Sequence, residues 1–245
     1  MMESRARKRW ILITRAREQG EQTARELRER GYLTLVDPVF ETRRVPFSLP
    51  QPESLQAVLL TSANAVYALG RELAGLPVYA VGRGTARAVR QRGATDVRAA
   101  RGDWQSLVER VVEELDPRAG KLLHLSGREL RGDIAGELER EGFSYERVVV
   151  YETAPREEIG SRTRHALSRR AVGAVLLYSP RTAATFARLV RDGGLEAGLE
   201  GVLCVCLSEA VAEEVTDLSS LEIVVARERD HTALLDCLEA HMPSC

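Results

Sequence analysis

The sequence has few of the residues on which metal sites and catalytic triads depend. Its histidines, His124, His165, His231 and His241, are scattered, and no two have the spacing of a zinc site or of a nucleophile and its base. It has four cysteines, of which Cys204 and Cys206 alternate with Val205 in an apolar run. We expect these two cysteines to share the core face of a strand. The sequence therefore predicts neither a metal site nor nucleophilic catalysis.

Lysine is nearly absent, with arginine supplying 33 of the 35 basic residues, and the formal net charge is −1. This charge creates no field that would attract nucleic acid or an anionic membrane surface. No apolar run is long enough to cross a bilayer, and the N-terminus does not resemble a secretory segment. We expect a cytoplasmic monomer that binds neither nucleic acid nor membrane.

Glycine-rich nucleotide loops are also missing. The sequence contains no GxxxxGK[ST] motif, and GRGTAR at residues 82–87 has two glycines but not the third that a dinucleotide loop requires. Nucleotide binding is therefore not expected.

The chain contains an internal duplication. Residues 9–42 are echoed by residues 121–153, and residues 58–69 by residues 175–189. Two fainter echoes pair residues 78–89 with 203–215 and residues 96–115 with 222–241. The copies are offset by 112 and 117 residues at the starts of the first two echoes, which indicates duplicated domains, because solenoid repeats run to roughly 20 to 50 residues.

Short apolar runs alternate with amphipathic helical stretches along the chain, which is typical of an α/β protein with buried parallel strands. Gly31, Gly93 and Gly142 each follow a charged helical stretch, where a left-handed residue ends a helix. The predicted strands are residues 10–13, 34–36, 57–60, 78–81, 122–125, 147–151, 174–178, 202–207 and 222–225.

The staggered order of the repeats predicts two lobes, one of which is discontinuous in sequence. Residues 1–38 with 154–245 form the first lobe, and residues 43–148 form the second. Residues 39–42 and 149–153 are expected to pair as a two-stranded connector between the lobes. A cleft between the lobes would then be the place for a ligand.

Hydroxyl residues and glycines follow the predicted strands, where ligands bind to open parallel sheets. Helix N-termini at these junctions would offer free amides and a partial positive charge to the carboxylates of a ligand. Each hydroxyl taken alone can instead be an ordinary helix cap. The residues predicted to bind are Thr61, Ser62, Gly82, Thr85, Ser126, Gly127, Ser179 and Ser208.

Six segments carry a resemblance to a known family: ILITRA, VLLTSANAV, VYAVGRGTA, LHLSGRELR, VVVYET and LLYSPRTAATF. In this order, over about residues 9–241, the chain resembles the uroporphyrinogen-III synthases. The resemblance implies two flavodoxin-like lobes with parallel sheets, joined by a two-stranded β connector. It also implies a cofactor-free cyclisation of hydroxymethylbilane to uroporphyrinogen III, with loss of water and inversion of the last pyrrole. Transient contact with hydroxymethylbilane synthase is a further implication.

The resemblance points to Tyr151, in VVVYET, as the catalytic residue, because the family has a tyrosine here. A tyrosine chosen for its strand propensity is the alternative interpretation. Arg15 is expected to pair with one carboxylate arm, although an exposed arginine at a helix start would look the same. The junction at Ser208 departs from the family pattern, and Glu209 beside it is expected to face solvent.

Two other functions remain open at this point. A non-catalytic regulatory module that binds a tetrapyrrole or small anion would have the same fold, but would be expected to carry a fused DNA-binding or methyltransferase region. A periplasmic-type binding protein also closes two α/β lobes on a ligand, but would need a secretion signal.

Overall fold

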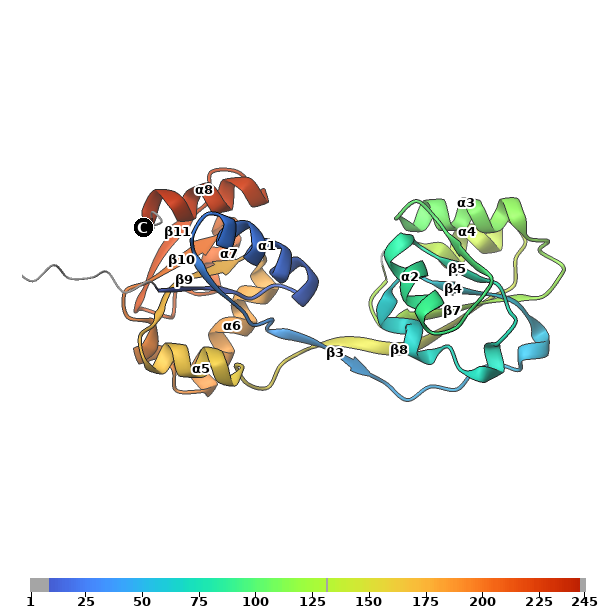
Figure 1. The fold of residues 1–245 in the computed structure, drawn as a ribbon, viewed down its shortest axis with the longest axis horizontal. Helices are drawn as coiled ribbons and strands as arrows, with labels where there is room; N and C mark the ends of the chain where they lie inside the picture. The colour runs from blue at the N-terminus through green and yellow to red at the C-terminus, as the bar shows by residue number, and fades with distance from the viewer. Residues whose placement is uncertain (1–8, 131, 243–245) are drawn as a thin grey trace, which may run out of the picture. The chain divides into compact units, whose positions relative to one another are not determined.

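The computed structural model describes residues 9–130 and 132–242, which group into two compact units (Figure 1). Unit 1 comprises the described residues of Met1–Glu41 and Pro155–Cys245, and unit 2 comprises those of Thr42–Ala154. Each unit has its own sheet and its own apolar core.

Unit 1 is built on a five-stranded parallel sheet with the order β11-β10-β9-β1-β2. Its strands are β1 (Trp10–Ile13), β2 (Leu33–Val36), β9 (Val172–Leu177), β10 (Val202–Cys206) and β11 (Leu221–Val225). Helices α1 (Arg17–Glu29) and α8 (His231–His241) cover one face of the sheet. The other face is covered by α5 (Ser161–Ser168), α6 (Pro180–Asp192) and α7 (Glu209–Glu213), with a short 3-10 turn at Glu196–Leu199.

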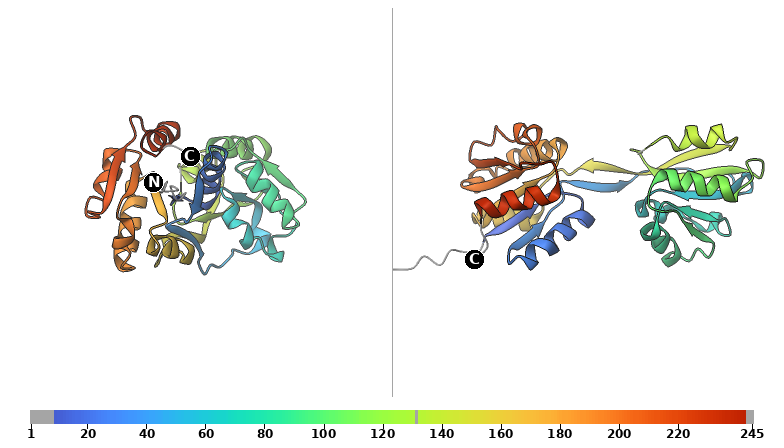
Figure 2. Two further views of the ribbon diagram at one scale, coloured as in Figure 1. Left: turned by 60° about the vertical axis from the view of Figure 1, so that its left-hand side comes forward. Right: turned by 90° about the horizontal axis from the view of Figure 1, so that it is seen from above.

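Unit 2 is built on a six-stranded sheet with the order β3-β8-β7-β4-β5-β6. The strands are β3 (Phe40–Arg44), β4 (Leu55–Leu60), β5 (Val78–Ala80), β6 (Val97–Ala99), β7 (Lys121–Gly127) and β8 (Tyr145–Pro155). Helices α3 (Trp104–Glu114) and α4 (Ile134–Arg140) lie side by side on one face (Figure 2). The other face is covered by α2 (Arg83–Gln91) and the 3-10 segments Ala63–Ala68 and Arg71–Leu73, while Pro52–Ser54 precedes β4.

All nine predicted strands are present, but two features of unit 2 differ from the prediction. Of the two strands beyond these nine, β3 overlaps the segment 39–42 that was expected in the connector. Strand β6 was not predicted, because it has only three residues and Arg98 interrupts its apolar run. Strand β8 runs from Tyr145 to Pro155 rather than over residues 147–151. Most of its residues are only half-buried or exposed, so an apolar run does not mark its ends.

The strand orders of the two units reproduce the internal duplication. The sequence echoes pair β1 with β7, β2 with β8, β9 with β4, β10 with β5 and β11 with β6. Substituting each strand by its echo converts the order β2-β1-β9-β10-β11 into β8-β7-β4-β5-β6, which is the order found in unit 2. Each repeat therefore occupies the same place in its own sheet. The order along the chain differs, because unit 1 begins with β1 and β2, whereas the echoes of these strands, β7 and β8, come last in unit 2.

Backbone conformation accounts for the glycines at the helix ends. Gly31, Gly93 and Gly142 have φ values of 87°, 97° and 83°. A left-handed residue after the last helical turn satisfies orphan carbonyls, and glycine adopts this conformation without a Cβ clash. The predicted helix ends at these three positions are confirmed.

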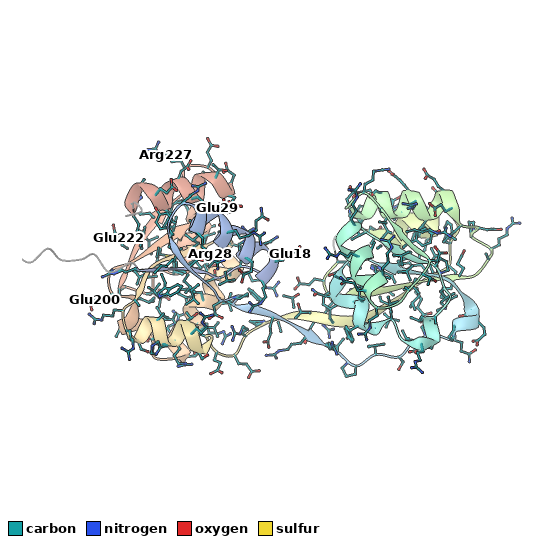
Figure 3. All side chains as sticks on the ribbon, in the orientation of Figure 1. Glu18, Arg28, Glu29, Glu200, Glu222 and Arg227 are labelled. Atoms are coloured by element: carbon teal, nitrogen blue, oxygen red, sulfur yellow. The ribbon has the colours of Figure 1, made fainter. Side chains whose placement is uncertain are left out.

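Charged residues occupy the outside of unit 1 and apolar ones its interior. Glu18, Arg28 and Glu29 are exposed on α1 (Figure 3). Cys204 and Cys206 are fully buried in β10, on the face that their alternation with Val205 predicted. Cys245 lies outside the described residues. Within residues 9–130 and 132–242, no helix is both long enough and apolar enough to span a bilayer.

Candidate functional site

A cavity of about 570 Å³ lies at the carboxyl ends of the parallel strands of unit 2. Four predicted site residues line it: Thr61 and Ser62 after β4, Gly127 at the end of β7, and Tyr151 in β8. The chain runs outward from β4 through β5 and β6 and then returns to place β7 on the other side of β4. The cavity is therefore at the point where the strand order reverses, which is where open α/β sheets bind ligands.

The Tyr151 ring packs directly on Gly127. The two residues are partners in the register of β7 and β8, after an irregularity between Ser126 and Gly127. A Cβ on residue 127 would lie 2.7 Å from Cε2 and Cζ of Tyr151 and 2.9 Å from its hydroxyl oxygen. Only glycine leaves room for the ring, so the backbone at Gly127 fixes where the Tyr151 side chain lies in the cavity.

Thr61 and Ser62 present hydroxyl groups on the β4 side of the cavity. Ser62 caps the following 3-10 segment, because its Oγ accepts a hydrogen bond of 3.2 Å from the Asn64 amide. The Oγ1 atom of Thr61 lies 3.0 Å from Nε2 of His124, a fully buried histidine of β7. Nδ1 of the same ring lies 2.6 Å from the Tyr145 hydroxyl.

Burial and a nearby cation keep His124 neutral. Desolvation lowers the pKa of His124 to about 4, and the positive charge of Arg147 acts in the same direction. Burial also raises the pKa of Tyr145 to about 12, so its hydroxyl keeps its proton. Arg147 itself donates from Nε to Ser126 Oγ (2.8 Å) and from Nη2 to the carbonyls of Gly127 and Arg128, both at 2.6 Å. Its guanidinium therefore holds the end of β7 in place.

Gly82 and Thr85 lie beside the cavity rather than in its lining. Gly82 precedes α2 in an extended conformation, and a Cβ there would lie 3.2 Å from Cα of Gly102. Gly102 does line the cavity, so this close approach shapes its wall. Thr85 is buried in the first turn of α2, with 8% of its surface exposed.

Ser126 does not cap a helix, in contrast to the expected junction. It is the penultimate residue of β7, it is fully buried, and its hydroxyl donates to the Gly127 carbonyl and accepts from Arg147. Helix α4 begins only at Ile134, and its cap is Asp133, which accepts from the Gly136 amide. The Ser126 side chain therefore supports the end of β7 and is not part of the cavity lining.

The three predicted residues of unit 1 follow β1, β9 and β10. The Arg15 guanidinium stacks 4.0 Å from the ring centre of Tyr178, at the reversal of strand order between β1 and β9. Ser179 caps α6 by accepting from the Thr182 amide. Ser208 precedes α7 but makes no cap hydrogen bond with its side chain. Glu209 is exposed in the first turn of α7, as expected.

Several residues that line the cavity were missed by the sequence analysis. Asp103 and Trp104 enter the lining because they follow β6, the strand that was not predicted. Asp103 caps α3, and the hydrogen bond from the Ser106 amide lowers the pKa of its carboxyl group. Arg128 donates to Glu152 over 2.8 Å. Two signals were available: Asp103 precedes a helical pattern, and Asp is a preferred N-cap, while the echo of residues 96–115 in residues 222–241 aligns β6 with the predicted strand 222–225.

The lining is polar and contains both signs of charge. Within residues 9–130 and 132–242, no group of three or more His, Cys, Asp or Glu side chains is arranged to hold a metal ion. The cavity instead offers hydroxyls, backbone amides and the Arg128 cation, alongside the carboxylates of Asp103 and Glu129. Such a surface can bind and orient an anionic ligand through hydrogen bonds.

Comparison with solved structures found similar proteins. The structure is similar to the crystal structure of uroporphyrinogen-III synthetase from Helicobacter pylori, with a TM-score of 0.50, 18% identity, and coverage of 95% of this chain and 99% of that chain. A mutant uroporphyrinogen III synthase from the extremely thermophilic bacterium Thermus thermophilus gives a TM-score of 0.44 at 18% identity, covering 94% of this chain and 97% of that one. The wild-type Thermus thermophilus enzyme gives a TM-score of 0.40 at 19% identity, covering 95% of this chain and 96% of that one.

No curated protein sequence matches the chain significantly. The family model described as uroporphyrinogen-III synthase HemD, however, matches residues 21–236, which is far more than half of the chain and spans both units. The protein therefore belongs to the uroporphyrinogen-III synthase family.

Proposed function

We propose that this protein is a uroporphyrinogen-III synthase, which cyclises hydroxymethylbilane to uroporphyrinogen III with loss of water and inversion of the last pyrrole ring. The observation that carries the proposal is the family match over residues 21–236. The cavity supports it, because hydroxyls and an open tyrosine surround the place where a ligand would bind in a sheet of this topology.

The cavity would act mainly by binding and orienting the substrate. Hydroxymethylbilane carries acetate and propionate arms, and Thr61, Ser62 and Arg128 offer hydrogen bonds to such carboxylates. A hydrogen bond to a charged group contributes about 1.5 to 3 kcal/mol, so a few suffice for micromolar binding after the cost of ordering the ligand. Because the substrate also closes without an enzyme, holding its ends in the geometry for inversion directs the product.

Tyr151 is the group proposed to assist departure of the substrate hydroxyl. Its own hydroxyl makes no hydrogen bond to another residue in the described part of the chain, and its side chain is half-buried in the cavity lining. It is therefore available to donate a hydrogen bond or a proton to the hydroxyl group as the carbon–oxygen bond breaks and water leaves.

The isomer ratio of the product tests the proposed function. Freshly made hydroxymethylbilane incubated with the protein is expected to give mainly the type III isomer, whereas the substrate alone gives type I. Chromatography of the oxidised porphyrins separates the two. A ratio equal to that of the control without protein would exclude synthase activity and favour the non-catalytic regulatory module.

Replacing Tyr151 by phenylalanine is expected to reduce kcat by about tenfold, because the ring keeps its packing while the donor at the leaving hydroxyl is lost. Tyr32→Phe is the matched control, since the Tyr32 hydroxyl donates to the Met242 carbonyl within unit 1. It should lower thermal stability without changing kcat. An unchanged kcat in Tyr151→Phe would show that this hydroxyl has no part in the mechanism. The alternative interpretation, a tyrosine present for its strand propensity, would then hold.

The remaining proposals concern partners and compartment. We propose a cytoplasmic enzyme that works as a monomer, without a cofactor, and receives hydroxymethylbilane in transient contact with hydroxymethylbilane synthase. The three cysteines described, Cys204, Cys206 and Cys237, are free thiols, which is compatible with a reducing compartment.

A further inference from the structure

A buried histidine lies directly behind the cavity wall and contacts one of its hydroxyl groups. His124 is 0% exposed, and its two ring nitrogens lie within hydrogen-bond distance of Thr61 and Tyr145. Thr61 lines the cavity, whereas His124 and Tyr145 do not. The three side chains thus connect the cavity to the interior of unit 2.

The sheet register explains why these residues meet. His124 of β7 is the register partner of Leu59 in β4, and Thr61 follows Leu59 by two residues. Tyr145 of β8 is the partner of Leu122, which precedes His124 by two residues. Because side chains alternate between faces, all three belong to the face covered by α3 and α4, and they step across neighbouring strands.

Counting protons leaves two possible arrangements of the hydrogen bonds at His124. A neutral imidazole has one donor nitrogen and one acceptor nitrogen. The contact of Nδ1 with the Tyr145 hydroxyl, at 2.6 Å, is shorter than that of Nε2 with Thr61, and a phenol is a stronger donor than an aliphatic hydroxyl, which favours the arrangement in which Tyr145 donates to Nδ1. The ring proton then lies on Nε2, which donates to Thr61 Oγ1 over 3.0 Å.

This arrangement leaves the Thr61 hydroxyl hydrogen without an acceptor among the described residues. A half-buried donor without a partner is unfavourable. Binding of a ligand that places an acceptor beside the Thr61 hydroxyl is therefore favoured. The opposite arrangement, with Thr61 donating to Nε2, would leave the Tyr145 hydroxyl without an acceptor and would turn only oxygen lone pairs toward the cavity. A carboxylate accepts hydrogen bonds and would be repelled by those lone pairs.

We propose that His124 and Tyr145 are positioning residues, which fix the Thr61 hydroxyl as a hydrogen-bond donor toward a carboxylate arm of the substrate. The proposal deepens the assigned function and rests on it for the identity of the ligand. The positioning role itself does not depend on that identity, because a Thr61 hydroxyl oriented as a donor by neutral His124 would bind any carboxylate in this cavity.

Two amide substitutions of His124 separate positioning from structural support. In His124→Gln the amide nitrogen reaches the place of Nε2 and can donate to Thr61. In His124→Asn the amide reaches only the place of Nδ1, near Tyr145. Both variants bury one amide in place of an imidazole, so a purely structural role predicts similar losses from the two.

The expected result is a difference in KM for hydroxymethylbilane. KM should stay within about threefold of wild type in His124→Gln and rise about tenfold in His124→Asn, with kcat changed less than KM. Thr61→Val should raise KM by a similar factor, and the double variant His124→Asn/Thr61→Val should be no worse than Thr61→Val alone. Equal KM values for the two amide variants, or multiplying effects in the double variant, would overturn the proposal.

A binding measurement keeps this test separate from that of the activity. In a Trp10→Phe background Trp104, in the cavity lining, is the one remaining tryptophan, and quenching of its fluorescence reports binding of the octacarboxylate uroporphyrin III. The Kd should follow the same order, with His124→Gln near wild type and both His124→Asn and Thr61→Val about tenfold weaker. If wild type makes no type III isomer but this order holds, the proposed function fails and the positioning role stands. If isomerisation occurs but the order is absent, only the positioning role fails.

Discussion

Gly127→Ala is expected to lower kcat/KM about 100-fold or more while the protein remains folded. The added Cβ would lie 2.7 Å from two ring carbons of Tyr151, a separation that forces the ring to move. Tyr151 is anchored through its backbone, since its carbonyl accepts from the Arg128 amide over 2.9 Å. The side chain is therefore the part that moves, and it lies in the cavity lining. The displaced ring would both withdraw its hydroxyl and take space from the substrate, and a misplacement of about 1 Å in the bound geometry can cost about 100-fold.

The effect should exceed that of Tyr151→Phe, which removes one hydroxyl but leaves the ring in place. Gly84→Ala is the matched control, because a Cβ at this exposed position in α2 would have no atom within 4 Å. Steady-state kinetics with the isomer assay, together with circular dichroism to confirm folding, compare the three variants. A Gly127→Ala enzyme with nearly normal kcat/KM would show that the close contact between residue 127 and the ring has no part in turnover.

The fold was largely predictable because most strands are apolar runs buried on both faces. The six residues of β9 are all buried, so its position follows from the sequence alone. Strand β6 was missed because Arg98 interrupts it, and the Asp103 and Trp104 side chains that follow it were missed with it. Local sequence identifies a strand that is stabilised by burying its own apolar side chains, but not one formed mainly by pairing at a sheet edge.

Site residues near the ends of parallel strands could be predicted from the sequence. Residues that meet only through the register of neighbouring strands could not. Thr61 follows β4 and Gly127 ends the neighbouring strand β7, while Tyr151 meets them as the register partner of Gly127 within β8. His124 and Tyr145 carry no motif, and their contact arises only once β7 and β8 are aligned. The hydroxyl-cap hypothesis was right for Ser62 and Ser179. It was wrong for Ser208, whose side chain makes no cap hydrogen bond, and for Ser126, because β7 continues to Gly127 before the chain turns.

Acid should destabilise unit 2 through His124 well before most carboxyl groups titrate. Burial lowers the pKa of His124 in the folded protein to about 4, with Arg147 acting in the same direction, while the unfolded value stays at 6.5. Other groups that face the ring are the Tyr145 and Thr61 hydroxyls, which carry no charge. Above about pH 6.5 the ring is neutral in both states and contributes nothing to the pH dependence. Below it, the unfolded chain binds a proton that the folded chain cannot, so stability falls until the pH reaches about 4.

The expected loss between pH 7 and pH 5 is about 2 kcal/mol, and the loss by pH 4 is about 3 kcal/mol, since one unit of pKa difference corresponds to about 1.4 kcal/mol. Urea unfolding of the Trp10→Phe protein, followed by Trp104 fluorescence, measures unit 2 separately from unit 1. His124→Gln provides the reference, because an amide does not titrate and all other acid-sensitive groups remain. The wild type should lose about 2 kcal/mol more than His124→Gln over this interval. Parallel pH profiles for the two proteins would mean that the pKa of His124 is the same in the folded and the unfolded protein, which would contradict its desolvation by burial.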